Sequence, residues 1–285
     1  MPDHSDRPIN IAYLGPPGTF TEQAASLCVP AGRRAELTPY PSITASAEAA
    51  ATGRADFAVL PFENSLAGAV GETHDLIIHQ IDSLAICNEI VIPIEHCLIA
   101  APTADTSRVE AIYSHPQALG QCQRYLQRRF PNARTEATLS TSQAVARAVE
   151  LGDFTLAIAP RRAAALHDAV ILEAGIEDDH RNATRFVVLA ARDHEPTGDD
   201  RSTILFSTAN RPGALLEALQ CFAKAGINLT RIESRPSREQ LGTYLFLVDC
   251  DGHRADPPLV GALQQVGAVV ERLRIVGSYP KATRT

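Results

Sequence analysis

Residues 182–186, with the sequence Asn-Ala-Thr-Arg-Phe, stand directly before the apolar run 187–190. The run is typical of a buried strand, so Thr184 and Arg185 are expected at the point where that strand begins. A hydroxyl and a guanidinium in this position can bind a small anionic molecule and donate to it. A purely structural interpretation is also open, in which Thr184 closes a turn, Arg185 is solvated and Phe186 begins the core.

A second polar group follows the apolar run 56–61, which we also predict to be a buried strand. Glu63, Asn64 and Ser65 come directly after it, and ligands of open α/β sheets bind beyond the carboxyl ends of the strands. These three side chains are therefore well placed to act on a substrate. The alternative is that they form only a turn and the cap of a helix predicted at 70–79.

Three predicted helices begin with polar residues. Thr19 opens a Thr-x-x-Glu capping box after the turn Gly-Pro-Pro-Gly. Ser114 opens the similar segment Ser-His-Pro-Gln, in which His115 and Gln117 follow it. Thr141 lies at the start of an Ala- and Val-rich helix. Unpaired N–H groups at such helix starts attract anions, although each segment is also explained as an ordinary capped helix.

The composition excludes several classes of function. The chain has 285 residues, a hydrophobic content of 45% and a formal net charge of −7, so it can build sizeable cores and lacks the basic excess of a nucleic-acid-binding protein. Its six cysteines are scattered without metal-ligand spacing. The polar first residues do not form a signal peptide, and no apolar run reaches membrane-spanning length. We therefore expect a cytoplasmic protein without metal or organic cofactors.

The order of the predicted elements indicates two domains. From residue 9 to about 190, strands alternate with helices, which predicts an α/β domain with a parallel sheet. A polar segment with Pro and Gly follows at 193–200. Beyond it we predict strands at 202–208, 228–234, 243–250 and 268–276, with helices after residue 213 and at 257–265. This βαββαβ order predicts a small α+β domain of the ferredoxin-like type.

Four segments resemble the sequence motifs of prephenate dehydratases. They are Tyr-Leu-Gly-Pro-x-Gly-Thr-Phe at 13–20, Glu-Asn-Ser-x-x-Gly at 63–68, Ser-His-Pro-Gln-Ala-Leu at 114–119 and Thr-Arg-Phe at 184–186. The resemblance implies a catalytic domain at 8–192 with two lobes, similar to the type II periplasmic-binding-protein fold. The chain would cross between the lobes near 95–101 and return near Thr184, which places this threonine at the hinge. Residues 201–279 would form an ACT domain, a module that senses amino acids.

The resemblance also implies a reaction, in which prephenate loses carbon dioxide and water to give phenylpyruvate in L-phenylalanine biosynthesis. Such a lyase needs a donor that helps the ring hydroxyl of the substrate to leave. In the family, this donor is assigned to the side-chain hydroxyl of the threonine in Thr-Arg-Phe. Catalytic residues are then expected at Thr184, Glu63, Asn64 and Ser65. Substrate contacts are expected at Thr19, Ser114, His115, Gln117, Thr141, Arg185 and Phe186.

In the predicted ACT domain, Gly-Ala-Leu-Leu at 213–216 and Thr-Arg-Ile-Glu-Ser-Arg-Pro at 230–236 match the phenylalanine-binding motifs of bacterial prephenate dehydratases. The match implies allosteric inhibition by L-phenylalanine. Effector contacts are expected at Asn210, Pro212, Gly213, Ala214, Leu215, Glu233, Ser234, Arg235 and Pro236. ACT domains commonly bind effectors between subunits, so we expect a homodimer or homotetramer with residues 233–236 across the subunit interface.

Two alternatives to this interpretation follow from the residues. Arogenate, whose side chain carries an amino group, is an alternative substrate, and a non-catalytic amino-acid sensor on a binding-protein fold is an alternative function. A threonine hydroxyl is a very weak acid, so Thr184 either donates a hydrogen bond or relays a proton from a group such as Glu63. Only about ten residues precede the first predicted strand, so we expect the chorismate mutase domain fused to some relatives to be absent.

Overall fold

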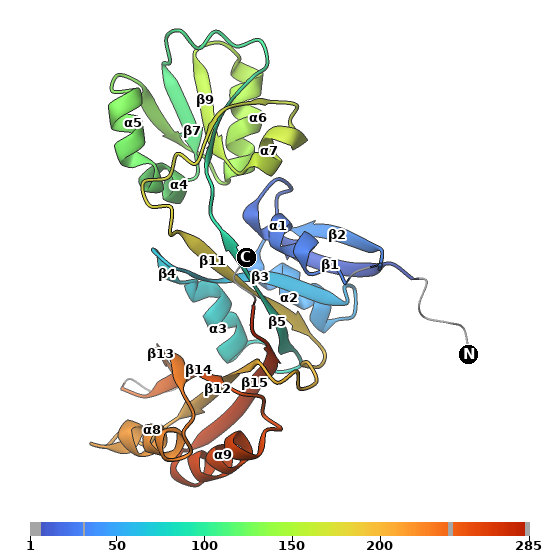
Figure 1. Cartoon of the computed structure of the whole chain (residues 1–285), viewed down its shortest axis with the longest axis vertical. Coiled ribbons are helices and arrows are strands. Elements are labelled where there is room, and N and C mark those ends of the chain that lie inside the picture. Colours follow the sequence, from blue (N-terminus) through green and yellow to red (C-terminus); the bar gives the residue numbers. More distant parts are fainter. Residues whose placement is uncertain (1–6, 31, 239–241, 283–285) are drawn as a thin grey trace.

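A computed structural model of the protein describes residues 7–30, 32–238 and 242–282. It consists of three bodies in a row: a central lobe 1, a lobe 2 at one end and a C-terminal domain at the other (Figure 1). Within the described part of the chain, no helix has the length and apolar character that crossing a membrane requires.

Lobe 1 is built on a six-stranded sheet whose main path is β2-β1-β3-β11-β5, with the short β4 paired to β3. β1 runs parallel to β2 and β3, whereas β11 runs antiparallel to β3 and β5. The elements of this lobe are β1 (Ile9–Leu14), α1 (Phe20–Leu27), β2 (Ala35–Tyr40), α2 (Ile43–Ala51), β3 (Phe57–Asn64), β4 (Gly68–Ala69), α3 (Gly71–His79), β5 (Ala85–Pro93) and β11 (Ala183–Ala190).

Lobe 2 has a five-stranded sheet in the order β10-β6-β9-β7-β8. β7 runs parallel to its neighbours β8 and β9, and β6 runs antiparallel to β9 and β10. Its elements are β6 (Cys97–Ala100), β7 (Ala111–Ser114), α4 (Pro116–Gln121), α5 (Gln123–Arg129), β8 (Arg134–Ala137), α6 (Thr141–Leu151), β9 (Thr155–Ala159), α7 (Arg161–Leu166) and β10 (Val170–Ala174).

Two chain segments join the lobes, 94–96 on the way into lobe 2 and 175–182 on the way back. They hydrogen-bond to each other, because the Ile94 N–H donates to the Asn182 carbonyl at 2.9 Å and the Ile176 N–H donates to the His96 carbonyl at 3.1 Å. Thr184 is the second residue of β11, directly after the return. The hinge is therefore a paired double connection, and the residues that follow it enter the middle of the lobe 1 sheet.

The C-terminal domain has the predicted βαββαβ order and a four-stranded antiparallel sheet arranged β13-β14-β12-β15. Its elements are β12 (Asp200–Ser207), α8 (Ala214–Lys224), β13 (Leu229–Pro236), β14 (Tyr244–Asp251), α9 (Pro257–Val269) and β15 (Arg272–Pro280). Alternate residues of a strand point to opposite faces. On β12, Ile204 and Phe206 pack under the two helices, whereas Leu205 faces lobe 1.

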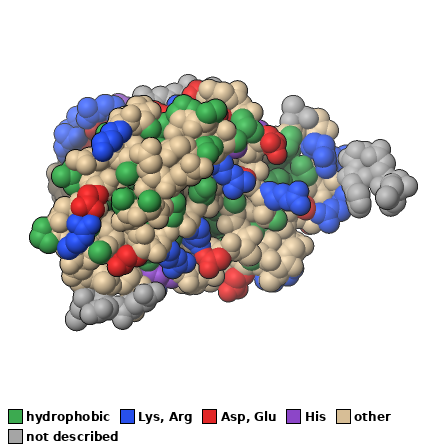
Figure 2. All heavy atoms as spheres, turned by 90° about the horizontal axis from the view of Figure 1, so that it is seen from below, with side chains coloured by type: hydrophobic (Ala, Val, Ile, Leu, Met, Phe, Trp, Pro, Cys, Tyr) green, Lys and Arg blue, Asp and Glu red, His purple; other side chains and the backbone are tan. Residues whose placement is uncertain are grey.

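The sheet of the C-terminal domain packs directly on lobe 1. One continuous apolar cluster contains Leu60 and Phe62 of lobe 1 together with Leu247 and Tyr279 of the C-terminal domain. β15 approaches β5 so closely that a Cβ on residue 277, a glycine, would lie 2.1 Å from a backbone oxygen of β5. The outer end of the C-terminal domain carries charged side chains of both signs among apolar ones (Figure 2). The domain is thus attached through a core, not through a flexible linker alone.

Candidate active site

Asn64 and Thr184 are register partners where β3 ends and β11 begins, and both are buried. Asn64 Nδ2 donates to Thr184 Oγ1 at 2.9 Å. The orientation of the amide is fixed, because Asn64 Oδ1 accepts from the N–H groups of Leu66 and Ala67 at 3.1 and 2.8 Å. The Thr184 oxygen is therefore an acceptor towards Asn64, and its O–H is available to donate in another direction. Because the sequence predicts a catalytic role for both, we call these two residues the catalytic pair.

The hinge segment holds the catalytic pair from the other side. Asn64 Nδ2 also donates to Asn182 Oδ1 at 2.8 Å, and Ser65 Oγ accepts from the Ala183 N–H at 3.0 Å. The Asn182 amide nitrogen is buried and has no hydrogen-bond partner among the described residues. It is thus a second donor beside the catalytic pair. Asn182 has no role among the predicted site residues, although its place two residues before Thr184 puts the two side chains on the same side of an extended chain.

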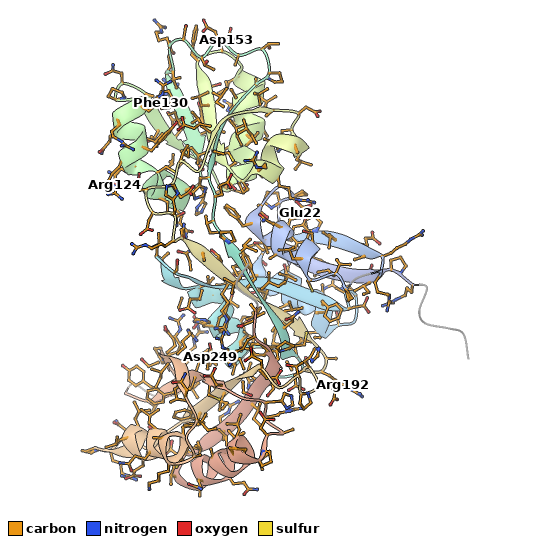
Figure 3. All side chains as sticks on the ribbon, in the orientation of Figure 1. Glu22, Arg124, Phe130, Asp153, Arg192 and Asp249 are labelled. Atoms are coloured by element: carbon orange, nitrogen blue, oxygen red, sulfur yellow. The ribbon has the colours of Figure 1, made fainter. Side chains whose placement is uncertain are left out.

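The turn before α1 contacts lobe 2. The Glu22 carboxylate on α1 accepts from the Gly18 N–H at 2.6 Å and from Nε and Nη2 of Arg162, on α7, at 2.7 and 2.8 Å. Glu22 lies on the side of lobe 1 that faces lobe 2 (Figure 3). The hydrogen bond from Arg162 is the main reason that the pKa of the Glu22 carboxyl lies below its ordinary value. An ion pair between a half-exposed and a nearly buried side chain therefore joins the two lobes beside the predicted site.

Two of the expected substrate residues lie on opposite sides of this contact. Thr19 caps α1 by accepting from the Glu22 N–H at 3.4 Å, and Thr141 is the first residue of α6 in lobe 2. A Cβ on Gly18 would lie 2.7 Å from Ser142 Oγ, so the turn that carries Thr19 abuts the start of α6. Gly18 also has a φ of +85°, which favours glycine. The contact between the lobes thus places two polar helix starts near each other.

The residues predicted on lobe 2 differ in their placement. Ser114 is fully buried and its hydroxyl donates to the Ile158 carbonyl at 2.6 Å, which corrects the expectation that it caps a helix and contacts substrate. His115 caps α4 instead, because its Nδ1 accepts from the Gln117 N–H at 3.3 Å. Burial lowers the pKa of His115, so the ring is neutral at neutral pH. Gln117 is exposed on the first turn of α4.

Arg185 points away from the space between the lobes. Its Nε donates to Glu89 at 2.7 Å, its Nη1 to Asp249 at 2.6 Å and its Nη2 to the Tyr279 hydroxyl at 2.8 Å. Asp249 and Tyr279 belong to the C-terminal domain, so the expectation of a substrate contact is corrected: Arg185 joins two domains. The physical reason is the alternation of a strand, which turns Arg185 to the face opposite the preceding threonine. Phe186 is likewise corrected, because it is buried in a core cluster of lobe 1.

Glu63 lies on the same side as Arg185. Its Oε2 is 3.9 Å from Arg185 Nη1 and 3.7 Å from Nε of Arg231, which lies on β13 of the C-terminal domain. The ring of Phe62 lies beside both guanidiniums, with distances of 4.9 and 5.0 Å from their carbons to its centroid. Glu63 therefore adjoins the catalytic pair in sequence, while its carboxylate faces the C-terminal domain.

The expected effector residues form two groups. Asn210, Pro212 and Gly213 make the exposed turn into α8, and Gly213 takes the left-handed conformation with φ +85° at the helix start. No side chain caps this start. The Ala214 N–H donates to the Arg211 carbonyl at 3.3 Å, and the N–H groups that follow it in the first turn are available to an anion. Ala214 is buried on the first turn, and Leu215 packs against the cluster between the helices and the sheet.

The second group lies on β13, an edge strand of the sheet. Ser234 and Pro236 are exposed on one face, whereas Glu233 and Arg235 are half-buried on the other. Arg235 donates to Asp75 at 3.1 Å and to the Gly71 carbonyl at 2.9 Å, both in lobe 1. Arg235 therefore contacts lobe 1 of its own chain, and the placement of residues 233–236 at a subunit interface stays a prediction.

The described residues contain no group of three or more His, Cys, Asp or Glu side chains that could hold a metal ion. All six cysteines are free thiols, and five of them are buried.

The fold and the site together define a class of protein: a two-lobed α/β domain with a donor pair at its hinge, joined through a core to a small domain of the kind that senses small molecules. Two family models match this chain. Residues 11–194 match the model described as prephenate dehydratase, and residues 202–268 match that of the ACT domain. The chain belongs to the prephenate dehydratase family, and the resemblance inferred from four motifs is confirmed.

Curated relatives agree with this assignment. The prephenate dehydratase of Corynebacterium glutamicum is 37% identical over 282 residues, which cover 97% of this chain and 89% of that protein. That of Amycolatopsis methanolica is 36% identical and covers 95% of this chain and 88% of that protein. The bifunctional chorismate mutase/prephenate dehydratase of Pseudomonas aeruginosa is 39% identical over 97% of this chain and 74% of that protein.

Solved structures agree in fold. Prephenate dehydratase from Arthrobacter aurescens in complex with L-Phe superposes with a TM-score of 0.88 at 34% identity and covers 96% of this chain and 90% of that one. A structure described as GqqA, a novel type of quorum quenching acylase, has a TM-score of 0.86 at 32% identity and covers 96% of this chain and 98% of that one. The predicted fold class, two lobes plus an ACT domain, is confirmed, but the prediction of a parallel sheet is corrected, because β11 and β6 run antiparallel to their neighbours and make both sheets of the catalytic domain mixed.

Proposed function

We propose that this chain is a decarboxylating dehydratase, a lyase that converts prephenate into phenylpyruvate, carbon dioxide and water in L-phenylalanine biosynthesis. The observation that carries the proposal is the fixed orientation of the Asn64 amide, which makes the Thr184 hydroxyl a donor at the hinge. Membership of the family and the names of the curated relatives support it.

The proposed reaction needs one well-aimed donor. The bond between the ring and its carboxylate breaks, its electron pair enters the ring, and the hydroxyl across the ring leaves as water with a proton that comes ultimately from solvent. The Thr184 O–H donates to the departing oxygen while Asn64 Nδ2 holds Thr184 Oγ1 in place. A preorganised donor of this kind typically accounts for about 10²–10³ in kcat.

The substrate is a dianion, and the contact between the lobes offers it donors. We place its carboxylates near the helix starts at Thr19 and Thr141, where N–H groups favour negative charge. The ring carboxylate must become neutral carbon dioxide, so it requires weaker binding than the side-chain carboxylate. Closure of the lobes excludes water, which favours this loss of charge.

The direct test is an assay with prephenate and arogenate side by side. We expect prephenate to be consumed with formation of phenylpyruvate. Preferential turnover of arogenate would identify an arogenate dehydratase, and turnover of neither substrate would identify a non-catalytic sensor. Asn64→Ala should lower kcat while the melting temperature stays close to that of the wild type; loss of activity that follows loss of folding would make Asn64 structural.

We further propose that L-phenylalanine inhibits the enzyme from the ACT domain, as the name of the Arthrobacter aurescens complex suggests. The N–H groups after Gly213 would bind its carboxylate, Asn210 or backbone carbonyls its ammonium, and Leu215 would face its ring. Gly213→Leu fills this approach and strains a left-handed residue. The variant should turn over prephenate normally and ignore L-phenylalanine in a kinetic titration; unchanged inhibition would place the effector elsewhere. We expect the protein to be cytoplasmic. We also expect it to form a homodimer or homotetramer, and sedimentation would test this oligomeric state.

The acylase description of one similar structure suggests a second activity, which the geometry does not favour. Amide hydrolysis needs an activated nucleophile. The described residues offer one Ser–His hydrogen bond, between Ser142 Oγ and His167 Nε2 at 3.3 Å. Ser142 is 2% exposed and packs against the turn at Gly18, so a substrate carbonyl has no approach to it. An acylase assay on the same preparation should give no turnover.

A further inference from the structure

The ACT domain contacts the residues that flank the catalytic pair on both strands. Asp249 on β14 accepts from Arg185, the residue after the catalytic threonine, at 2.6 Å. Arg231 on β13 lies with its Nε 3.7 Å from the carboxylate of Glu63, the residue before the catalytic asparagine. Asp249 lies where the ACT domain meets lobe 1 (Figure 3). Each member of the pair is therefore adjacent in sequence to a residue whose side chain contacts a charged group of the ACT domain.

These two contacts differ in strength. Arg185 makes three short bonds, so its position is firmly fixed. The side chain of Arg231 is only 9% exposed, yet its Nη1 has no hydrogen-bond partner among the described residues, and its carboxylate contacts, Glu63 and Glu233, lie at 3.7 and 3.6 Å. A buried donor without a partner costs about 1–3 kcal/mol, so arrangements in which it regains one lie close in free energy.

The surroundings of Arg231 allow such a rearrangement. Glu63 and Arg231 both line a cavity of about 560 Å³ between lobe 1, the hinge and the ACT domain. The remaining neighbours of the Arg231 guanidinium are a ring nitrogen of His74 at 3.2 Å and the ring of Phe62, and neither of them is a carboxylate. On β13 itself, Glu233 follows two residues later and belongs to the expected effector motif. A shift of β13 is therefore transmitted to the guanidinium first.

We propose that Arg231 is a positioning residue that couples effector binding on the ACT domain to the catalytic pair through Glu63. The inference rests on the proposed function and names the link between its two sites. An effector bound beside Glu233 moves Arg231, the Glu63 carboxylate follows the guanidinium, and Asn64, the next residue of β3, loses its alignment with Thr184. Couplings of this kind typically change an affinity by about 5–150-fold.

Arg231→Gln tests the link by kinetics and calorimetry. L-phenylalanine should still bind this variant in a calorimetric titration, while the concentration for half-inhibition, measured relative to the variant's own uninhibited rate, rises by about 10-fold or more. Arg231→Lys, which keeps a positive charge near Glu63, should retain part of the inhibition. The matched control is Arg201→Gln, which removes another guanidinium from the same domain contact, where it donates to Glu89 at 2.6 Å, and leaves Glu63 untouched.

A second readout does not depend on turnover. The N–H groups of Leu66 and Ala67 are held by the Asn64 side chain, so their hydrogen exchange reports its alignment. Exchange at 66–67 should be faster in Arg231→Gln than in the wild type and unchanged in Arg201→Gln.

The inference would be overturned by unchanged inhibition of Arg231→Gln, by equal loss of inhibition in both variants, or by unchanged exchange at 66–67. Failure of calorimetric binding in Arg231→Gln would also overturn it, because the residue would then belong to the effector site. Absence of prephenate turnover by the wild type would refute the proposed function. Even then, exchange that is faster in Arg231→Gln but not in Arg201→Gln would establish the link from Arg231 to Asn64.

Discussion

Asp249→Asn removes the negative charge with which the ACT domain contacts Arg185. We expect this substitution to destabilise the folded protein markedly. Asp249 is fully buried and accepts from Arg185 Nη1 at 2.6 Å and from Thr203 Oγ1 at 2.7 Å. Burial alone would raise the pKa of Asp249, but Arg185 and Arg231 outweigh it and hold the pKa below its ordinary value. The carboxylate is therefore ionised and neutralises buried positive charge.

Removal of one partner of a buried ion pair typically costs about 3–5 kcal/mol. Arg185 keeps Glu89 and the Tyr279 hydroxyl in the variant, so we expect the lower end, about 3 kcal/mol. For a chain of this size, that corresponds to a fall in melting temperature of roughly 6–12 °C. Thermal and urea denaturation of both proteins at neutral pH would measure the difference.

The matched control is Glu150→Gln, which makes the same change from acid to amide in an exposed pair with Arg147. It should alter the free energy of unfolding by less than about 1 kcal/mol. Replacing both buried partners by apolar residues, Arg185→Met with Asp249→Leu, should recover much of the loss, because neither charge is left alone. A stability of Asp249→Asn within about 1 kcal/mol of the wild type would refute the reasoning.

Two further predictions concern the same contact. Gly277→Ala should destabilise the protein by about 1–3 kcal/mol, because its Cβ would meet the Ile86 backbone at 2.1 Å, whereas Gly261→Ala, in open space on α9, should not; denaturation of both checks this. The pKa of His74 is lowered to about 3 by burial and by Arg231, so between pH 6.5 and 3 the unfolded chain binds more protons and stability falls as the pH falls. The wild type should lose about 2 kcal/mol more than His74→Gln between pH 7 and 5, and equal losses would contradict a neutral buried His74.

The sequence was sufficient for the fold class and for the positions of Asn64 and Thr184 at the ends of two strands. Asn64 follows one recognisable apolar run, and Thr184 precedes another. Polar residues are expected at such strand ends because ligands of open α/β sheets bind in the crevice beside them. The βαββαβ order of the ACT domain was equally readable, because each strand and helix carries its own hydrophobic period.

The sequence was not sufficient to identify the residues that each predicted site residue contacts in the folded protein. Arg185 looked like a substrate ligand because its partner Asp249 lies 64 residues away and belongs to another domain. Ser114 looked like a helix cap, yet it is the last residue of β7, and its hydroxyl turns into the sheet. Asn182 was overlooked because its bond to Asn64 exists only when the hinge is folded.

The central claim is that the Thr184 hydroxyl donates to the departing oxygen while Asn64 holds it in place. Thr184→Val keeps the shape of the side chain and removes the O–H, and Asn64 Nδ2 retains Asn182 Oδ1 as an acceptor, so the fold should persist. We predict that kcat with prephenate falls by about 10²–10³-fold in Thr184→Val, with little change in melting temperature, and that Thr184→Ser retains more activity. A Thr184→Val enzyme that turns over prephenate at the wild-type rate would contradict the account.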